Sequence, residues 1–451
     1  MAERLSILNA TPSRIEGPSL LHQLVARDDD GDAIAIDYLG LDGVSKQVTY
    51  TDLHRRSDLL ATRLRSILNA ATTGNEHCIV PIFMPQCPAL YISQLAVLKA
   101  GGAFCPLSLD VPEERLRFIL SDVGARLLLT TEELEQSLPN LQDVEILPIG
   151  KSSVDAVEHT TLPNQILSSS PAYIMYTSGS TGLPKAVVIS HSAATQALLA
   201  HERHIPSFSR FLQFASPTFD VSVFEIFFPL FRGRTLVSGD RRQLLSDLPN
   251  FVNRMKVDAA ELTPSVASSL LQGRQSVPGL KVLLTIGEML RQDVVAEFGG
   301  SDQTSSVLHG MYGPTEATIH CTLQVNFAKS MSVGCIGVPL DTVSAFIVSP
   351  ADENGDTFPS IEILPVGDEG ELAVGGHQLA DGYLNRPEQT RSAFVDHPEY
   401  GRLYRTGDKA RMNRDGYLEC LGRISGGQVK LRGQVSLTEP EKYRALMLTF
   451  Q

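Results

Sequence analysis

The stretch YTSGSTGLPK, from Tyr176 to Lys185, is the most informative part of this 451-residue sequence. Its two glycines allow backbone conformations and close approaches that other residues cannot make. Its hydroxyl side chains and successive backbone N–H groups can form an anion-binding nest, to which Lys185 adds a positive charge. An apolar strand is predicted directly before the stretch and a helix after it, so we interpret it as a phosphate-binding loop. It is not a Walker loop, because no serine or threonine follows the lysine.

Strands and helices alternate on both sides of this loop. Short apolar strands are predicted at 78–84, 103–107, 125–131 and 144–150, and again at 171–177, 234–239, 259–263, 281–287 and 305–313. A hairpin around 41–46 and an amphipathic helix over 53–64 precede them, and the segment 88–102 reads as a helix. This alternation predicts a largely parallel sheet covered by helices. Beyond Cys335 short strands and turns predict a β-rich subdomain.

Composition excludes several classes of protein. Lysine and arginine total 38 against 51 aspartate and glutamate, so the formal net charge of −13 argues against a nucleic-acid or anionic-membrane partner. No run approaches the ~18 apolar residues of a membrane-spanning helix. The six cysteines show no metal-ligand or C-x-x-C spacing, which indicates reduced thiols. We therefore expect a cytoplasmic protein with no nucleic acid or membrane partner.

Eight motifs occur in an order that resembles the adenylate-forming superfamily, which includes acyl-CoA synthetases and the adenylation domains of non-ribosomal peptide synthetases. After YTSGSTGLPK come FDVSVFEIF, IGE, MYGPTEATI, GELAVGG, GYLNRPEQT, YRTGD and GR, and LKAGGAFCPLSLD matches upstream. The resemblance implies an α/β fold, the large N-terminal domain of such an enzyme, with two α/β subdomains and a β-rich one. It also implies ATP and Mg²⁺ as cofactors.

The resemblance assigns roles to the matching residues. The loop that grips the β- and γ-phosphates of ATP corresponds to Thr177, Ser178, Gly179, Ser180, Thr181, Gly182 and Lys185. Tyr312 resembles the aromatic residue that stacks on adenine, and Gly287 and Glu288 lie in the matching adenine-side turn. Each of these residues taken alone has an ordinary structural explanation, and the ordered set favours function.

Further matches concern the α-phosphate, the metal ion and the ribose. Thr315 resembles an α-phosphate contact and Glu316 the Mg²⁺ ligand, and with Lys185 they are the expected catalytic residues. Asp408 resembles the carboxylate that accepts the ribose hydroxyls, and Arg423 lies nearby on the nucleotide. Hard cations prefer oxygen ligands, and a diol suits an ionised acceptor.

Asp220 distinguishes between classes within the superfamily. In peptide-synthetase adenylation domains an aspartate at this place pairs with the α-amino group of the substrate, and acyl- and aryl-CoA synthetases usually lack it. A half-buried carboxylate is costly without a cationic partner. The alternative is that Asp220 only caps the helix that follows it.

The same alignment predicts the lining of the substrate pocket, which comprises Asp220, Val221, Phe224, Glu261, Leu284, Ile286, Met311, Ile319 and His320. Five of these are bulky and apolar, which favours a small amino acid such as glycine, alanine or serine. Glu261 leaves open a side chain with an amine or hydroxamate, as in ornithine derivatives. The opening LSILNATPSR resembles fungal ferrichrome-type siderophore synthetases, which use both kinds. The other histidines are expected to be packing or surface residues.

The family pattern breaks near the C-terminus. We expect residues 1–421 to form the core of the adenylation domain, 422–433 a hinge remnant and 434–451 an atypical tail. The small C-terminal lid, its lysine and any carrier domain are expected to be missing, through a retained intron or in a lidless protein. Phosphopantetheine would then be present only on a carrier-protein partner acting in trans.

The predicted function is ATP-dependent activation of an amino-acid carboxylate as aminoacyl-AMP, in the non-ribosomal synthesis of a siderophore. Two alternatives stay open at this point. One is a carboxylate–CoA ligase, against which Asp220 argues. The other is a remnant that binds ATP and amino acid with little turnover, because it lacks the lid lysine.

Overall fold

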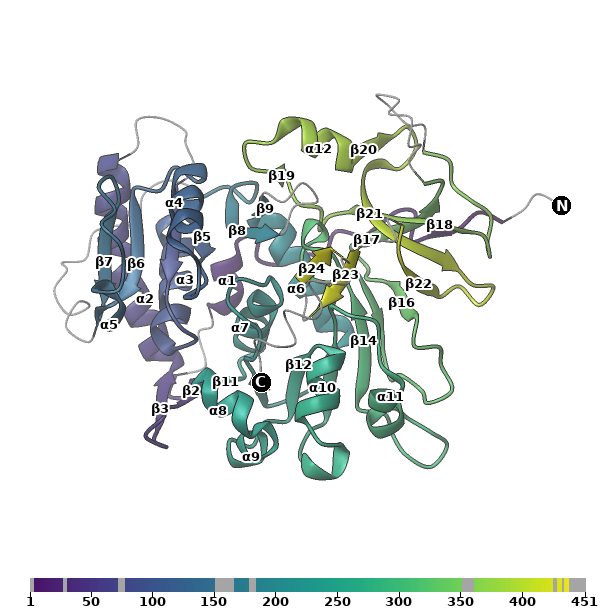
Figure 1. Cartoon of the computed structure of the whole chain (residues 1–451), viewed down its shortest axis with the longest axis horizontal. Helices are drawn as coiled ribbons and strands as arrows, with labels where there is room; N and C mark the ends of the chain where they lie inside the picture. The colour runs from purple at the N-terminus through teal and green to yellow at the C-terminus, as the bar shows by residue number, and fades with distance from the viewer. Residues whose placement is uncertain are drawn as a thin grey trace.

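Two β-sheets and the helices around them organise the chain, shown as a computed structural model in Figure 1. The structure describes residues 4–26, 31–71, 78–150, 166–177, 184–350 and 361–424, and the backbone of 428–431 and 434–437. Within these residues the helices are α1 (Leu21–Val25), α2 (Tyr50–Ala71), α3 (Pro88–Ala100), α4 (Glu113–Asp122), α5 (Glu132–Glu135), α6 (His191–His204), α7 (Val221–Phe231), α8 (Arg241–Ser246), α9 (Leu248–Arg254), α10 (Pro264–Leu270), α11 (Gln292–Phe298) and α12 (Pro387–Ala393). Two short 3₁₀ helices are η1 (Arg274–Ser276) and η2 (Thr315–Ala317).

The first sheet has seven strands among the described residues, in the order β19-β9-β8-β5-β4-β6-β7. Its members are β4 (Ile79–Phe83), β5 (Ala103–Pro106), β6 (Leu127–Thr131), β7 (Glu145–Ile149), β8 (Pro171–Thr177), β9 (Lys185–Ser190) and β19 (Gly382–Tyr383). Strands β4 to β8 pair in parallel, whereas β9 and β19 are antiparallel to their neighbours. The predicted parallel sheet is therefore confirmed for this part of the chain.

The second sheet follows the order β1-β17-β18-β21-β22-β16-β15-β14-β13-β12-β10-β11-β2-β3, with β20 beside β21. Its members are β1 (Ile7–Leu8), β2 (Ile34–Leu39), β3 (Ser45–Thr49), β10 (Arg210–Leu212), β11 (Thr235–Gly239), β12 (Ala259–Leu262), β13 (Val282–Thr285), β14 (Leu308–Tyr312), β15 (Thr322–Gln324), β16 (Cys335–Pro339), β17 (Val343–Val348), β18 (Glu369–Gly376), β20 (Phe394–His397), β21 (Gly401–Met412) and β22 (Leu418–Arg423). The β-rich part is continuous with the parallel part through β15 and β16.

Helix α7 lies between the two sheets and joins their cores (Figure 1). Its Phe227 stacks on Phe104 of the first sheet, with ring centroids 6.2 Å apart. One turn earlier Phe224 packs against Phe211 of the second sheet at 5.8 Å. A helix that is apolar on several faces suits burial between layers. Asp220, directly before α7, is consequently placed deep between the sheets.

The surroundings of the predicted phosphate-binding loop differ from the prediction in one respect. The segment after the loop begins with strand β9, and α6 starts only at His191, so the loop connects two antiparallel strands instead of a strand and a helix. The physical reason is that 185–190 is rich in β-branched residues and pairs with β8. This hairpin belongs to the first sheet, whereas the early hairpin of β2 and β3 joins the second.

The predicted hinge and tail lie only partly within the described residues. Strand β22 runs through Arg423 and so crosses the predicted boundary at 421. Beyond it, β23 (Gln428–Leu431) and β24 (Gln434–Leu437) form a separate antiparallel pair, drawn in yellow in Figure 1. The division into core, hinge and tail stays a prediction.

Candidate functional site

The two ends of the predicted phosphate-binding loop are held by a strand pair. Thr177 closes β8 and Lys185 opens β9, and the two residues are direct partners in the ladder. Ser178, Gly179, Ser180, Thr181 and Gly182 lie outside the described residues. The strand pairing fixes where the loop leaves and re-enters the sheet.

Tyr383, a residue that was not predicted to belong to the site, contacts both Lys185 and Glu316. Strand β19 pairs with β9, which brings Tyr383 beside the start of the hairpin. The Nζ atom of Lys185 lies 4.9 Å from the centroid of the Tyr383 ring, a cation–π arrangement. The Tyr383 hydroxyl donates to Oε1 of Glu316 at 2.7 Å. The motif GYLNRPEQT contained the signal for Tyr383, but nothing local to it indicates these two contacts.

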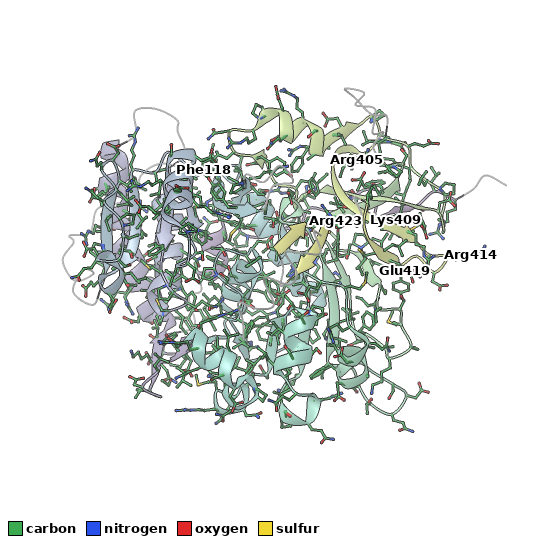
Figure 2. All side chains as sticks on the ribbon, in the orientation of Figure 1. Phe118, Arg405, Lys409, Arg414, Glu419 and Arg423 are labelled. Atoms are coloured by element: carbon green, nitrogen blue, oxygen red, sulfur yellow. The ribbon has the colours of Figure 1, made fainter. Side chains whose placement is uncertain are left out.

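A second cluster consists of Tyr312 at the end of β14 and of Asp408 and Arg423, which are ladder partners on β21 and β22. The Tyr312 hydroxyl donates to Oδ2 of Asp408 at 2.6 Å, and Nη1 of Arg423 donates to Oδ1 at 2.9 Å. Burial raises the pKa of the Tyr312 phenol well above its usual value, and the charge of Asp408 adds to the rise. In Figure 2 Arg423 lies toward the centre of the molecule, whereas Arg414 lies at the rim of the β-rich part. The structure thus brings together three residues predicted to bind the nucleoside.

The predicted adenine-side turn follows β13. Gly287 has a φ of +90°, a conformation that glycine adopts without strain. The Glu288 carboxylate Oε2 accepts a hydrogen bond from the backbone N–H of Ser265 at 3.2 Å and another from its hydroxyl. Glu288 therefore ties the turn to the start of α10.

Asp220 stands at the first turn of α7 but makes no capping hydrogen bond through its side chain. It is 9% exposed, and among the described residues its Oδ2 has no hydrogen-bond partner. Burial raises the pKa of Asp220 to about 6, the charges of Glu316 and Glu261 add to the rise, and the Thr315 hydroxyl opposes it. The simple explanation as a helix cap therefore does not account for this carboxylate.

The residues predicted to line the substrate pocket come from five separate stretches between residues 220 and 320. Glu261 on β12 and Leu284 on β13 are direct ladder partners, and Met311 lies on the neighbouring strand β14. Phe224 packs its ring against that of His320, with centroids 5.0 Å apart. All except Val221 are buried, as are the remaining members Ile286 and Ile319.

Two of these residues, Glu261 and His320, belong to a buried chain of polar contacts that also includes His201. Nε2 of His320 lies 2.6 Å from Oε1 of Glu261, and Nδ1 of His320 lies 3.0 Å from Nε2 of His201 on α6. Nδ1 of His201 in turn lies 2.5 Å from the Ala197 carbonyl oxygen. His201 is a buried packing residue, as expected, and it also makes a polar contact with His320 that was not predicted. The sequence does not reveal this contact, because the two histidines are 119 positions apart.

Turn geometry holds His320 in place. Thr318 and Ile319 have φ values of +57° and +69°, and Nε2 of Gln378 donates to the His320 carbonyl at 2.7 Å. Residues with positive φ are kept there only by their surroundings. The segment from Thr315 to His320 is thus held at its start, through Glu316, and at its end, where His320 contacts Glu261.

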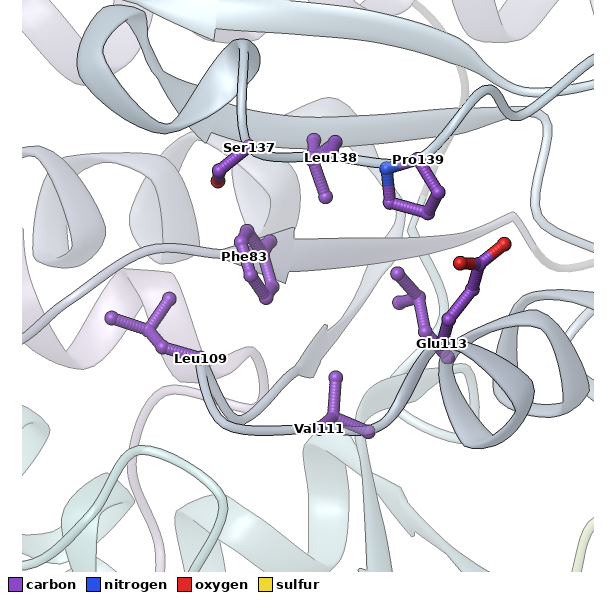
Figure 3. Close-up of a pocket in the computed structure, with 8 residues that line it drawn as sticks. Phe83, Leu109, Val111, Glu113, Ser137, Leu138 and Pro139 are labelled. Carbon is purple, nitrogen blue, oxygen red and sulfur yellow. The ribbon is translucent and has the colours of Figure 1, made fainter.

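A separate cavity of about 380 Å³ lies in the N-terminal part of the molecule. In Figure 3 the side chains of Phe83, Val111 and Leu138 face a common space. None of the predicted site residues lines it. It therefore does not belong to the candidate site.

Two further properties concern metals and membranes. Within the described ranges no group of three or more histidine, cysteine, aspartate or glutamate side chains is arranged to hold a metal ion. A single carboxylate such as Glu316 suits Mg²⁺, which usually binds one or two carboxylates together with substrate phosphates. Of the helices in the part of the chain that the structure describes, none is both long and apolar enough to cross a membrane.

Comparison with known proteins shows the family of the chain. Residues 25–384 match the family described as AMP-binding enzyme, so the chain belongs to the AMP-binding enzymes. It is 57% identical over 431 residues to the nonribosomal peptide synthetase SIDC of Beauveria bassiana (95% of this chain, 9% of that protein). It is 35% identical over 458 residues to the siderophore peptide synthetase fer3 of Mycosarcoma maydis (95% and 9%). The chain spans about a tenth of the length of these relatives.

The fold matches that of a solved peptide synthetase. The crystal structure of the nonribosomal peptide synthetase FmoA3 in its AMPPNP-bound form superposes with a TM-score of 0.78 and 25% identity, over 92% of this chain and 44% of that one. The predicted fold class, the large domain of an adenylate-forming enzyme, is thereby confirmed. The chain is an ATP-dependent, AMP-forming type of enzyme by family, and the predicted resemblance to siderophore synthetases is confirmed.

Proposed function

We propose that this chain activates an amino acid: one carboxylate oxygen of the amino acid attacks the α-phosphorus of ATP. The bond from that phosphorus to the bridging oxygen breaks, pyrophosphate leaves and aminoacyl-AMP remains. The observation that carries the proposal is the buried carboxylate of Asp220 beside Thr315 and Glu316. The ammonium group of an amino acid supplies the cation that such a carboxylate needs.

Each cluster has one task in this reaction. Asp220 binds the α-ammonium group and so aims the substrate carboxylate toward Thr315, which contacts the α-phosphate. Lys185 and the loop before it hold the β- and γ-phosphates and neutralise charge on the leaving pyrophosphate. Tyr312, Asp408 and Arg423 hold the adenosine end. Catalysis of this kind depends on position and charge more than on covalent steps.

Glu316 is the residue that would hold Mg²⁺, with Tyr383 fixing the carboxylate through its 2.7 Å hydrogen bond. The ion would neutralise phosphate charge when it is bound. Tyr383 also positions Lys185 by facing its ammonium group. One tyrosine therefore sets the distance between the two groups that handle phosphate.

The wider setting is also part of the proposal. The similarity to a siderophore peptide synthetase supports a small or ornithine-type amino acid as substrate and a carrier protein as the acceptor of the acyl group. The core is proposed to comprise residues 1–421, with 422–433 as a hinge and 434–451 as a tail. Cytoplasmic location belongs to the same proposal.

One experiment tests this function against its alternatives, namely acid-dependent exchange of pyrophosphate into ATP across amino, fatty and aryl acids. Exchange with one amino acid supports the proposal. Exchange with a fatty or aryl acid instead would point to a carboxylate–CoA ligase. No exchange, with ATP still bound in calorimetry, would point to a binding protein with little turnover. Asp220→Ala is the matched variant, because unchanged acid selectivity in it would contradict the amino-acid assignment.

A further inference from the structure

The buried chain of His201, His320 and Glu261 has a defined arrangement of protons. The Ala197 carbonyl can only accept, so Nδ1 of His201 carries a hydrogen. His201 is fully buried beside the rings of Phe224 and Phe228, and burial lowers its pKa well below the usual value. Its ring is therefore neutral, and its Nε2 can only accept from Nδ1 of His320.

One proton is then left for the contact between His320 and Glu261. Nε2 of His320 and Oε1 of Glu261 are 2.6 Å apart, a distance that requires a hydrogen between them. The pair is either imidazole with carboxylic acid or imidazolium with carboxylate, and its net charge is zero in both cases. Burial favours the form without charges, because it lowers the pKa of His320 to about 3 and raises that of Glu261 well above its usual value.

The second carboxylate oxygen of Glu261, Oε2, is the observation that indicates a ligand. Oε2 is buried and has no hydrogen-bond partner among the described residues, although buried polar atoms are nearly always paired. Glu261 lies on β12 beside Leu284, and it is close enough to Asp220, where the amino acid is proposed to bind, for the two carboxyl groups to interact. The vacant acceptor therefore belongs to the same site as Asp220.

A cationic side chain does not suit this acceptor. Glu261 carries a full negative charge only when the shared proton moves to Nε2 of His320, and the resulting imidazolium lies 2.6 Å from the carboxylate and cancels that charge. The pair therefore offers no net negative charge to a cation. An uncharged donor, such as a hydroxyl, amide or hydroxamate group, satisfies Oε2 and leaves the chain intact.

We propose that His201, acting through His320, keeps Glu261 as a neutral acceptor, so that the site selects amino acids whose side chain donates a hydrogen bond without carrying a positive charge. This inference rests on the proposed function and narrows its substrate class. His201 is a positioning residue in it, and Glu261 is the residue that contacts the substrate side chain.

The test uses binding and so does not depend on turnover. Calorimetry would measure the affinity of four aminoacyl sulfamoyl adenosines, which imitate aminoacyl-AMP: the seryl, alanyl, ornithyl and N5-acetylornithyl compounds. We expect the seryl or the N5-acetylornithyl compound to bind most tightly, and the ornithyl compound at least about tenfold more weakly. The inference is overturned if the ornithyl or the alanyl compound binds most tightly.

Two variants distinguish a positioning role of His201 from a purely structural one. His201→Phe frees His320 to change tautomer and Glu261 to ionise, so the gap between the ornithyl compound and the best neutral one should shrink by at least about fivefold. His191→Phe, an equally buried histidine on the same helix, should leave that gap unchanged. Equal weakening of all four compounds by His201→Phe would contradict a positioning role.

Glu261→Gln keeps the test valid if His201→Phe does not fold. Its amide N–H can donate to Nε2 of His320 while its oxygen still faces the site, so the order of affinities should be retained within about threefold. Loss of the neutral compounds in Glu261→Gln would overturn the inference. If none of the four compounds binds although ATP does, the proposed function itself fails, which is a different outcome from altered selectivity.

Discussion

Single side chains in this site are held by contacts that come from distant parts of the chain. Asp220 is the clearest case, because its carboxylate is buried, makes no helix-capping hydrogen bond, and has no lysine or arginine acting on it among the described residues. The sequence predicted its role from a motif, and the structure adds that ionisation there is costly. The contacts of Tyr383 and His201 could not be predicted, since their partners are 67 and 119 residues away.

The cost of ionising Asp220 leads to a prediction about stability and pH. Its pKa rises from 3.8 to about 6 on folding, so the ionised form destabilises the fold by about 3 kcal/mol above pH 6 and not below about pH 4. Asp220→Asn should therefore gain stability over the wild type as pH rises from 4 to 6, while losing roughly 100-fold or more in amino-acid affinity. Urea denaturation at several pH values measures the first effect.

A control for this prediction is Asp302→Asn, because Asp302 is exposed. Its stability difference from the wild type should not depend on pH in the same range. A difference for Asp220→Asn that stays constant from pH 4 to 7 would contradict the costly buried carboxylate.

Tyr383 supports a prediction about metal dependence. In Tyr383→Phe the Glu316 carboxylate loses the donor that orients it, and such outer-shell losses weaken metal binding roughly tenfold or more. We expect nucleotide binding to require a correspondingly higher Mg²⁺ concentration, measured by calorimetry over a range of Mg²⁺. The exposed Tyr417, changed to phenylalanine, serves as control. Identical Mg²⁺ curves for the wild type and Tyr383→Phe would refute the positioning role.

Among elements, the segment that links β14 to β15 has the greatest influence on the site. It carries Thr315 and Glu316 on η2 and His320 after a turn with two positive φ values. Gly313 lies against the end of the same segment, where an added Cβ would stand 2.1 Å from the Ile319 carbonyl oxygen and 2.6 Å from Cα of His320. The phosphate side and the amino-acid side of the site thus share one short piece of backbone.

This packing predicts that Gly313→Ala affects both sides at once. The new methyl group has to displace backbone, which costs about 1–3 kcal/mol of unfolding free energy. Affinity for ATP and for the amino acid should fall together, because Thr315 and His320 move with the segment. Gly279→Ala is the matched control, since no atom lies within 4 Å of its added Cβ. A variant that weakened only one ligand would contradict the shared segment.

In the whole molecule, the site lies where the two sheets meet. Gln86 follows β4 of the first sheet, and its Nε2 donates to Oε1 of Gln213 at 2.8 Å and to the Ala215 carbonyl at 2.8 Å. Glu225 of α7 accepts hydrogen bonds from the backbone N–H groups of Phe214 and Ala215. This network fixes the segment that leads to Asp220 between the sheets.

Replacing Gln86 by methionine, which has a similar volume, should therefore destabilise the fold by about 1–3 kcal/mol, because buried acceptors lose their donor. Chemical denaturation would measure the change, and Gln303→Met on an exposed loop is the control. Equal stability of the two variants would show that the bridge between the sheets contributes nothing.

Local information in the sequence determined most of the elements and the class of enzyme. Runs such as 78–84 and 281–287 became strands as predicted, since alternation and apolar length are properties of neighbouring residues. The residues proposed to bind phosphate, as well as Tyr312 and Asp408, could be singled out from the sequence because their motifs are contiguous.

Tertiary structure determined which sheet each strand joined and which side chains met. The hairpin of β8 and β9 joined the first sheet, β2 and β3 joined the second, and β19 returned from residue 382 to place Tyr383 beside Lys185. The neutral state of Glu261 depends likewise on His201, which no local pattern links to it. These contacts form because folding buries residues from distant parts of the chain against one another. A short stretch of sequence does not contain the information that identifies such a partner.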